Sequence, residues 1–215
     1  KEGVIELLGN GSRFGAKITY IDQPEPRGLA HAVMVSQDFL ENDPFVMYLG
    51  DNMLKQGAKP LVDVFQKKGG DCVIGVAKVE DPSRYGVVIF DDEKRIKHLV
   101  EKPKQFVSEW ALIGVYVFNN KIFDAVKRIR PSWRNELEIT DAIQVLLKDG
   151  ANVNVQFVQS WWKDTGRPED LLEANQLVLH DLEPFNQGLI EEGATLTSLV
   201  GVGSNTIVHK DSTIR

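Results

Sequence analysis

The sequence predicts a layered α/β protein, in which helices flank a sheet and the start of a parallel β-helix follows. From residue 17 to about 118, short runs rich in β-branched residues alternate with helical patterns, which indicates a layered sheet. After Glu183, apolar residues recur at intervals of six, as in hexapeptide repeats. The 215 residues, 42% of them hydrophobic, allow one large domain with a smaller extension.

Seven strands and five helices are expected in order. The expected strands cover residues 17–21, 45–49, 72–79, 86–90, 96–102, 112–118 and 153–158. The expected helices cover residues 28–39, 59–68, 121–130, 138–148 and 168–179. The fourth helix has apolar residues on a single face. In the fifth, Pro168 takes a first helical position and two acidic residues follow in the first turn, which suits the helix dipole.

The C-terminal repeat predicts a second domain. Its apolar positions are Ile190, Leu196, Val202, Val208 and Ile214. An irregular tail or an ordinary hairpin is an alternative, but the interleaved glycines favour a β-helix. The expected domains are therefore residues 1–183 and 184–215. Because the chain opens in the middle of a helical pattern and closes inside a repeat, we expect a fragment of a longer protein.

Composition excludes several functions. A net charge of −6 and a pI near 5.3 argue against nucleic-acid binding, which needs a basic face. No segment reads as a membrane span or a signal peptide, so a cytoplasmic protein is expected. The single cysteine, Cys72, allows neither a disulfide framework nor a cysteine-based zinc site, and it is expected to be a buried strand residue.

Two aspartates are candidate metal ligands. Asp51 directly follows an apolar strand, where ligands of open α/β sheets bind, and Asp164 follows the pair Trp161-Trp162. Two such carboxylates suit magnesium, a hard cation that takes oxygen ligands. A turn or cap role is the alternative for Asp51. Asp164 stands too early to cap the helix at Pro168, where Thr165 or Gly166 would serve better.

The segment Gln23–Ala32 is a strand exit with two prolines that leads into a helix. Gly28 at the helix start would let the backbone approach a ligand closely, although from this segment alone a plain strand-to-helix turn is favoured. His31 is interpreted as a packed or surface histidine.

Lys102 and Arg134 are candidate phosphate ligands, since a guanidinium can bind a phosphate through two hydrogen bonds. Either residue could instead be a surface charge. Glu138, Thr140 and Asp141 could simply cap and charge the start of a helix.

Together and in this order, these segments resemble the glucose-1-phosphate thymidylyltransferase family of sugar nucleotidylyltransferases, particularly its longer members with a β-helix. The resemblance runs from about Gly11 to Asp181, and its most specific parts are residues 23–32, 49–52, 101–103, 136–141 and 162–166. It implies a Rossmann-like, GT-A-like mixed sheet followed by a left-handed β-helix.

The resemblance also implies roles for individual residues. The implied nucleotide-binding residues are Gln23, Pro26, Gly28, Leu29 and Asp51, and the implied magnesium ligands are Asp51 and Asp164. The implied sugar-phosphate site consists of Asn52, Tyr85, Gly86, Glu101, Lys102, Gly114, Arg134 and Trp162. Asp51, Asp164, Lys102 and Arg134 would carry the catalysis.

The implied reaction joins a nucleoside triphosphate to a sugar 1-phosphate, with dTTP and glucose 1-phosphate as the favoured pair, and Mg²⁺ as cofactor. The family's glycine-rich loop is not found in these residues, and Arg27 and Asn135 depart from its pattern. Two alternatives remain: a regulatory subunit that binds nucleotide sugar, and a bifunctional enzyme whose β-helix transfers an acyl group with His209 as base. A homo-oligomer is expected.

Overall fold

The computed structural model describes residues 2–197 and 199–214, and its contacts divide them into two units. The first unit contains the described residues up to Leu49 together with Ala58–Gln159. The second contains Gly50–Gly57 and the described residues from Ser160 onward. The chain therefore leaves the first unit at residue 50, returns to it at residue 58 and leaves it again at residue 160.

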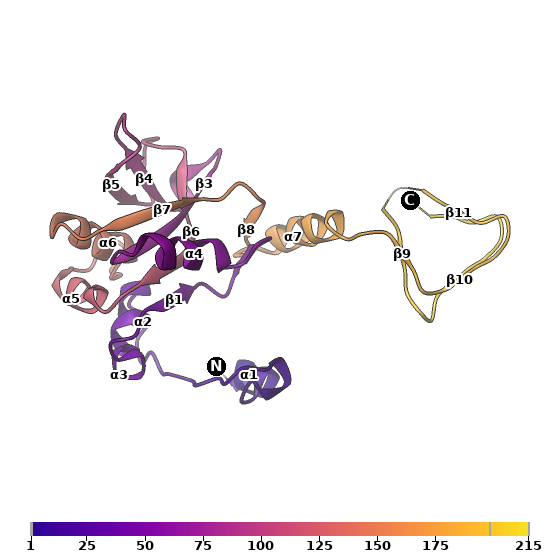
Figure 1. Cartoon of the computed structure of the whole chain (residues 1–215), viewed down its shortest axis with the longest axis horizontal. Coiled ribbons are helices and arrows are strands. Elements are labelled where there is room, and N and C mark those ends of the chain that lie inside the picture. The colour runs from indigo at the N-terminus through magenta and orange to yellow at the C-terminus, as the bar shows by residue number, and fades with distance from the viewer. Residues whose placement is uncertain (1, 198, 215) are drawn as a thin grey trace. The chain divides into compact units, whose positions relative to one another are not determined.

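A mixed six-stranded sheet forms the centre of the first unit (Figure 1). Its strands are β1 (Phe45–Tyr48), β3 (Cys72–Lys78), β4 (Gly86–Phe90), β5 (Ile96–Glu101), β6 (Trp110–Phe118) and β7 (Val153–Phe157). The order is β5-β4-β6-β3-β7, with β1 also paired to β6. Strands β3 and β7 are parallel, whereas β6 runs antiparallel to β1, β3 and β4.

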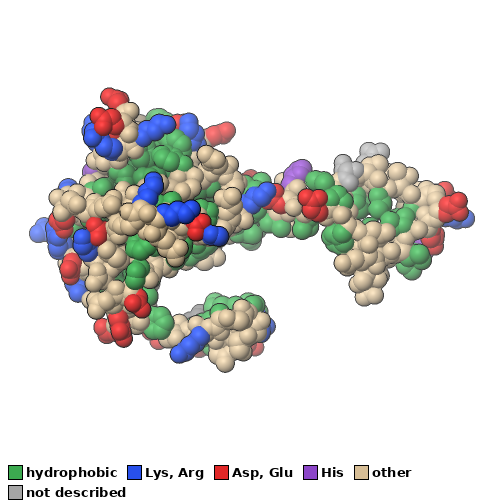
Figure 2. Space-filling view, in the orientation of Figure 1, with side chains coloured by type: hydrophobic (Ala, Val, Ile, Leu, Met, Phe, Trp, Pro, Cys, Tyr) green, Lys and Arg blue, Asp and Glu red, His purple; other side chains and the backbone are tan. Residues whose placement is uncertain are grey.

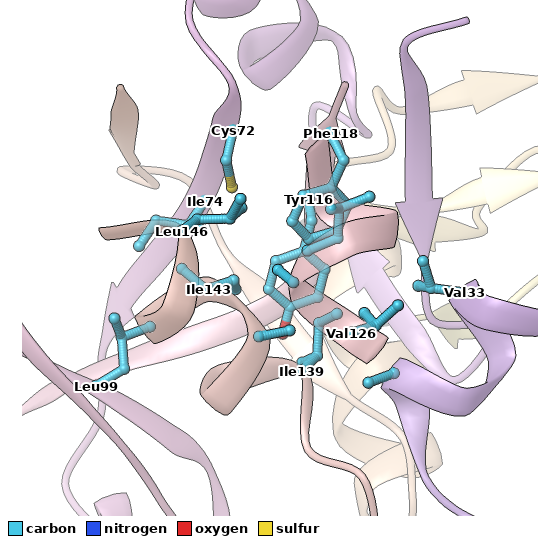
Figure 3. Packing of buried hydrophobic residues seen from close by; sticks show 14 of the residues in the cluster. Val33, Cys72, Ile74, Leu99, Tyr116, Phe118, Val126, Ile139, Ile143 and Leu146 are labelled. Atoms are coloured by element: carbon cyan, nitrogen blue, oxygen red, sulfur yellow. The ribbon is translucent and has the colours of Figure 1, made fainter. Parts of the chain in front are cut away.

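Helices cover both faces of this sheet. They are α2 (Leu29–Val35), α3 (Gln37–Leu40), α4 (Lys59–Lys68), α5 (Lys121–Arg128) and α6 (Ile139–Lys148), and α1 (Glu2–Leu8) precedes them. Because side chains alternate along a strand, Cys72 and Ile74 of β3 share one face, and Figure 3 shows them beside Ile143 and Leu146 of α6. On the other face, Leu61 of α4 is fully buried. Burial of each such aliphatic side chain contributes about 1.5–3 kcal/mol.

Most of the predicted elements are confirmed to within a few residues. Strand β4 and helix α4 have the predicted bounds, and Cys72 is a buried strand residue. The helix expected over residues 28–39 divides at Ser36, whose Oγ donates to the carbonyl oxygen of Ala32 at 2.8 Å, a contact that weakens a helix.

The strand expected over residues 17–21 is wrong. These residues belong to no strand, because a β-strand requires a partner for its backbone groups and no described segment pairs with them. β-Branched composition indicates an extended chain, but it does not supply the neighbouring strand.

The second unit begins with a short antiparallel ribbon of β2 (Asn52–Leu54) and β8 (Trp162–Asp164), followed by α7 (Pro168–His180). Six two-residue strands follow: β9 (Phe185–Asn186), β10 (Leu189–Ile190), β11 (Thr195–Leu196), β12 (Gly201–Val202), β13 (Ile207–Val208) and β14 (Thr213–Ile214). Leu189 pairs in parallel with Ile207, and Thr195 with Thr213. Both pairs are offset by 18 residues (207 − 189 and 213 − 195), which is the length of three hexapeptides, whereas Gly201 and Phe185 pair at an offset of 16 (201 − 185). Val202 and Val208 are buried.

The surface carries charges of both signs. On the face in view in Figure 2, Lys and Arg side chains are interspersed with Asp and Glu side chains over the first unit. Within the described residues, no helix combines the length and the apolar character that crossing a membrane requires.

Candidate functional site

The two predicted metal ligands meet at one end of the β2–β8 ribbon in the second unit. Asp164 is the last residue of β8 and lies opposite Asn52, the first residue of β2. Asp51 immediately precedes β2, and its carbonyl oxygen accepts hydrogen bonds from the backbone nitrogen of Thr165 at 2.8 Å and from its Oγ1 at 2.7 Å. Backbone pairing thus fixes both aspartates at the same end of the ribbon.

The side chain of Asn52 connects Asp51 to Trp162 through two hydrogen bonds. Its Nδ2 donates to Oδ1 of Asp51 at 2.9 Å, and its Oδ1 accepts from Nε1 of Trp162 at 2.6 Å. Oδ1 of Asp164 accepts from the backbone nitrogen of Gly166 at 3.0 Å. Within the described residues of this unit, Oδ2 of Asp51 and Oδ2 of Asp164 accept no hydrogen bond.

This donor set fits magnesium. The described residues contain no cluster of three or more His, Cys, Asp or Glu side chains that could hold a metal. A complete protein cage is therefore not offered by that part of the chain, but Asp51 and Asp164 place two carboxylates at the same end of the ribbon. Magnesium keeps several waters and binds through one or two carboxylates together with substrate phosphates, and the aspartate pair meets that requirement.

The opposite face of β8 fixes the ribbon to α7. Lys163 alternates with Trp162 and Asp164, and its Nζ contacts Oδ1 of Asp170 at 2.8 Å and also the carboxylate of Glu173. Burial alone would lower the pKa of Lys163, but the hydrogen bonds to Asp170 and Glu173 outweigh it and raise the pKa. The N-cap of α7 is Arg167, so the expectation that Thr165 or Gly166 caps this helix is wrong.

In the first unit, Glu101 ends β5 directly opposite Gly86 of β4. Its Oε2 accepts a hydrogen bond from Oγ1 of the buried Thr140 at 3.2 Å. A Cβ at Gly86 would lie 2.6 Å from Cγ2 of Thr140 and 2.9 Å from Oε2 of Glu101, so only glycine leaves room for this pair. Burial raises the pKa of Glu101, as does the negative charge of Glu138, although Thr140, Lys102 and Arg134 oppose the shift.

Arg134 lies in a network of three carboxylates. Its guanidinium is 2.8 Å from Glu136, 3.5 Å from Glu138 and 3.6 Å from Glu101. Its backbone nitrogen donates to Oγ of Ser132 at 3.1 Å. With a side chain only 22% exposed, Arg134 is not the free surface charge that was the alternative interpretation.

Lys102 and Asn135 both have unusual backbones. Lys102 has a φ of 41°, and its backbone nitrogen donates to the carbonyl oxygen of Tyr85 at 3.0 Å. Asn135 has a φ of 61°. Asparagine tolerates this left-handed conformation better than most residues, so Asn135 can occupy a position where the resembled family often has glycine.

The segment with Gln23 and Gly28 abuts the segment that carries Arg134. Gly28 has a φ of 98°, and a Cβ there would lie 2.6 Å from the carbonyl oxygen of Leu137. The backbone nitrogen of Leu137 donates to the carbonyl oxygen of Arg27 at 2.7 Å, and that of Ala30 donates to the carbonyl oxygen of Leu137 at 3.0 Å. Pro26 lies two residues before Gly28, and Leu29 is the first residue of α2. Gly114 stands apart in the middle of β6, where its φ is 69°.

The predicted site residues therefore form two groups. The first unit holds Gln23, Pro26, Gly28, Leu29, Tyr85, Gly86, Glu101, Lys102, Gly114 and Arg134, and the second holds Asp51, Asn52, Trp162 and Asp164. Sequence analysis missed the contacts of Ser132, Glu136, Glu138 and Thr140 with these residues. Their position in one acidic and polar run with Arg134 was the available signal, but helix capping explained it equally well.

Comparisons with known proteins identify the family. A sequence profile described as nucleotidyl transferase matches residues 1–181. The chain is 48% identical over 196 residues to the low-salt glycan biosynthesis nucleotidyltransferase Agl11 of Haloferax volcanii, covering 91% of this chain and 55% of that protein. It is 45% identical over 206 residues to glucose-1-phosphate thymidylyltransferase of Streptomyces antibioticus, covering 95% and 58%.

Two solved structures to which the chain is similar also carry names of sugar nucleotidylyltransferases. A Bacillus anthracis structure assigned as a glucose-1-phosphate thymidylyltransferase, in complex with a sucrose, matches with a TM-score of 0.76 and 34% identity over 86% of this chain and 74% of that one. A UDP-glucose pyrophosphorylase complexed with UDP-glucose matches with a TM-score of 0.70 and 25% identity over 83% and 72%.

The fold and the sequence profile define one class, and the chain belongs to the nucleotidyl transferase family. Within that family it is similar to glucose-1-phosphate thymidylyltransferases. The chain spans a little more than half the length of the first two curated relatives, 55% and 58%.

Proposed function

We propose that the protein containing this chain is a sugar-1-phosphate nucleotidylyltransferase that joins dTTP to glucose 1-phosphate and releases pyrophosphate. The observation that carries this proposal is the aspartate pair on the β2–β8 ribbon, where Oδ2 of Asp51 and Oδ2 of Asp164 remain available to a cation. The similarity to glucose-1-phosphate thymidylyltransferases supports the choice of substrates.

The chemistry requires no general base. An oxygen of the sugar phosphate attacks the α-phosphorus of the triphosphate in line, and the bond from that phosphorus to the β-phosphate bridging oxygen breaks. A phosphate monoester has a second pKa of about 6, so the attacking oxygen is already ionised near neutrality. Catalysis then depends on positioning two anions and on neutralising their charge.

The aspartate pair would hold Mg²⁺. The ion, when bound, would neutralise and orient the α-phosphate of the nucleotide. Asn52 would keep the carboxylate of Asp51 in place through the hydrogen bond from its Nδ2, and Trp162 would in turn fix Asn52. The left-handed β-helix proposed for residues 184–215 would lie outside this chemistry.

The candidate residues of the first unit are proposed to bind substrate groups. Lys102 and Arg134 would bind the sugar phosphate, while Glu101 would accept hydrogen bonds from sugar hydroxyls. The three carboxylates around Arg134 orient its guanidinium, and the incoming phosphate would replace part of that negative charge. Gln23 and the turn around Gly28 would contact the nucleobase.

A pyrophosphate-release assay of the full-length protein tests this function directly. The assay crosses five nucleoside triphosphates, including dTTP, with glucose 1-phosphate and other hexose 1-phosphates. The highest rate is expected for dTTP with glucose 1-phosphate. Absence of release with every pair would leave the regulatory-subunit alternative in its place.

We also propose that the repeat unit mediates homo-oligomer formation. Leu189 and Ile207 lie side by side in a parallel pair, yet Leu189 is 58% exposed and Ile207 is 54% exposed. Light scattering of the full-length protein and of a Leu189→Glu, Ile207→Glu variant checks this. Two glutamates on this exposed apolar surface should weaken association, so the variant should have a smaller molar mass than the wild-type assembly. Consumption of acetyl-CoA would instead support the acyltransferase alternative.

A further inference from the structure

The buried histidine of α2 contacts the side chain proposed to read the nucleobase. His31 is only 9% exposed. Its Nδ1 lies 3.1 Å from Nε2 of Gln23 and 3.1 Å from the carbonyl oxygen of Glu25. Gln23 itself is an exposed residue, but its amide nitrogen is held by these contacts.

The orientation of the Gln23 amide follows from its other contact. Nε2 also lies 3.1 Å from the carbonyl oxygen of Gly28, and only the nitrogen end of the amide can donate to a carbonyl oxygen. One hydrogen of Nε2 is thus used by Gly28, and the second points at Nδ1 of His31. Within the described residues of the first unit, Oε1 of Gln23 accepts no hydrogen bond.

The tautomer of His31 decides whether this arrangement holds. With its proton on Nε2, the ring accepts from Gln23 through Nδ1, and the contact of Nδ1 with the carbonyl oxygen of Glu25 at 3.1 Å is then not a hydrogen bond. With a proton on Nδ1, the ring would donate to the carbonyl oxygen of Glu25 and would repel the NH₂ group of Gln23. The amide could then rotate and present nitrogen where it now presents oxygen.

We propose that His31 is a positioning residue for nucleobase selection, because it fixes the Gln23 amide with its acceptor Oε1 directed at the base. This inference rests on the proposed function. A fixed acceptor pairs with the N3–H donor of thymine or uracil. Cytosine has an unprotonated N3, which is itself an acceptor, and is disfavoured at the same position.

The test compares binding of dTTP and dCTP to the full-length protein by calorimetry. In His31→Leu the amide of Gln23 loses one of its two hydrogen bonds and is held only by the carbonyl oxygen of Gly28, so the preference for dTTP over dCTP should fall about fivefold to tenfold, the value of one hydrogen bond. In His31→Asn the Oδ1 atom can accept where Nδ1 accepts now, and most of the preference should return. Affinity for the sugar 1-phosphate should be unchanged in both variants.

Val33→Ala is the matched control, since Val33 lies on the same helix and is 4% exposed but does not hydrogen-bond Gln23. It should lower the melting temperature without changing the nucleotide preference. An unchanged preference in His31→Leu, an equal loss in Val33→Ala, or no rescue by His31→Asn would each overturn the inference. Because binding is the readout, the two proposals can fail separately. A wild-type protein that binds dTTP selectively but releases no pyrophosphate would refute the proposed enzyme activity, and the His31 variants would still test the positioning role of His31.

Discussion

The carboxylate of Glu101 illustrates how function can cost stability at a single residue. Its pKa is raised first by burial and then by the charge of Glu138. The folded protein therefore holds the proton more tightly than the unfolded chain, so this group contributes stability below the ordinary glutamate pKa of 4.5. That contribution is lost as the pH rises through the folded-state pKa.

Glu101→Gln should consequently stabilise the protein at pH 7 while weakening sugar binding. We expect the melting temperature to rise by about 2 °C at pH 7 and the difference from the wild type to shrink toward pH 4.5. The KM for glucose 1-phosphate should rise about tenfold, because a hydrogen bond to a charged acceptor is replaced by one to a neutral amide. The exposed Glu93→Gln is the control. A lower melting temperature at pH 7 than the wild type would contradict the burial argument.

Asp51→Asn and Asp164→Asn test the metal assignment at the residue scale. Each change keeps the size of the side chain and the backbone pairing of the ribbon, but it removes a negative oxygen ligand. Turnover should fall on the order of a thousandfold, with an unchanged circular dichroism spectrum. Asp92→Asn, in an exposed turn, should have the wild-type rate, and near-normal rates in either ribbon variant would remove that aspartate from the metal site.

At the scale of elements, the turn at Gly28 joins two site segments through close backbone contact. Gly28→Ala would place a Cβ 2.6 Å from a carbonyl oxygen in a backbone conformation with φ of 98°. We expect a loss of about 2 kcal/mol or more in the free energy of unfolding, measured by urea titration, and weaker binding of dTTP. Gly3→Ala, with no atom within 4 Å of its Cβ, is the matched control and should be neutral or slightly stabilising.

Elements with strong local patterns could be predicted from the sequence, whereas those made by distant pairing could not. The apolar run of β4 and the amphipathic pattern of α4 predicted the first and last residues of both elements. The β2–β8 ribbon was missed because each strand has three residues, too few for a periodic signal, and joins residues 110 apart. Arg134 and Glu101 were both predicted, but their proximity depends on where the sheet places β5.

At the scale of the whole molecule, the stability of the apolar core should not depend on the proposed metal. The apolar core of the first unit contains no metal-ligand candidate, and the aspartate pair lies in a partly exposed ribbon. Treatment with EDTA should therefore abolish pyrophosphate release without changing the melting temperature, and added Mg²⁺ should restore the rate. A large fall in melting temperature with EDTA would assign the ion a structural role instead.

The division of the chain between two units has a consequence for protein synthesis. Asp51 leaves the ribosome well before its backbone partner Thr165, which is 114 residues further along the chain. At translation rates of about 5–20 residues per second, roughly 6–23 seconds separate the two. The sheet of the first unit can assemble during most of this interval, while residues 50–57 wait as an unpaired loop. The newly made chain thus acquires most of its fold before its proposed cation site, and a ribosome stalled before β8 would display a largely folded protein in which that proposed site cannot yet form.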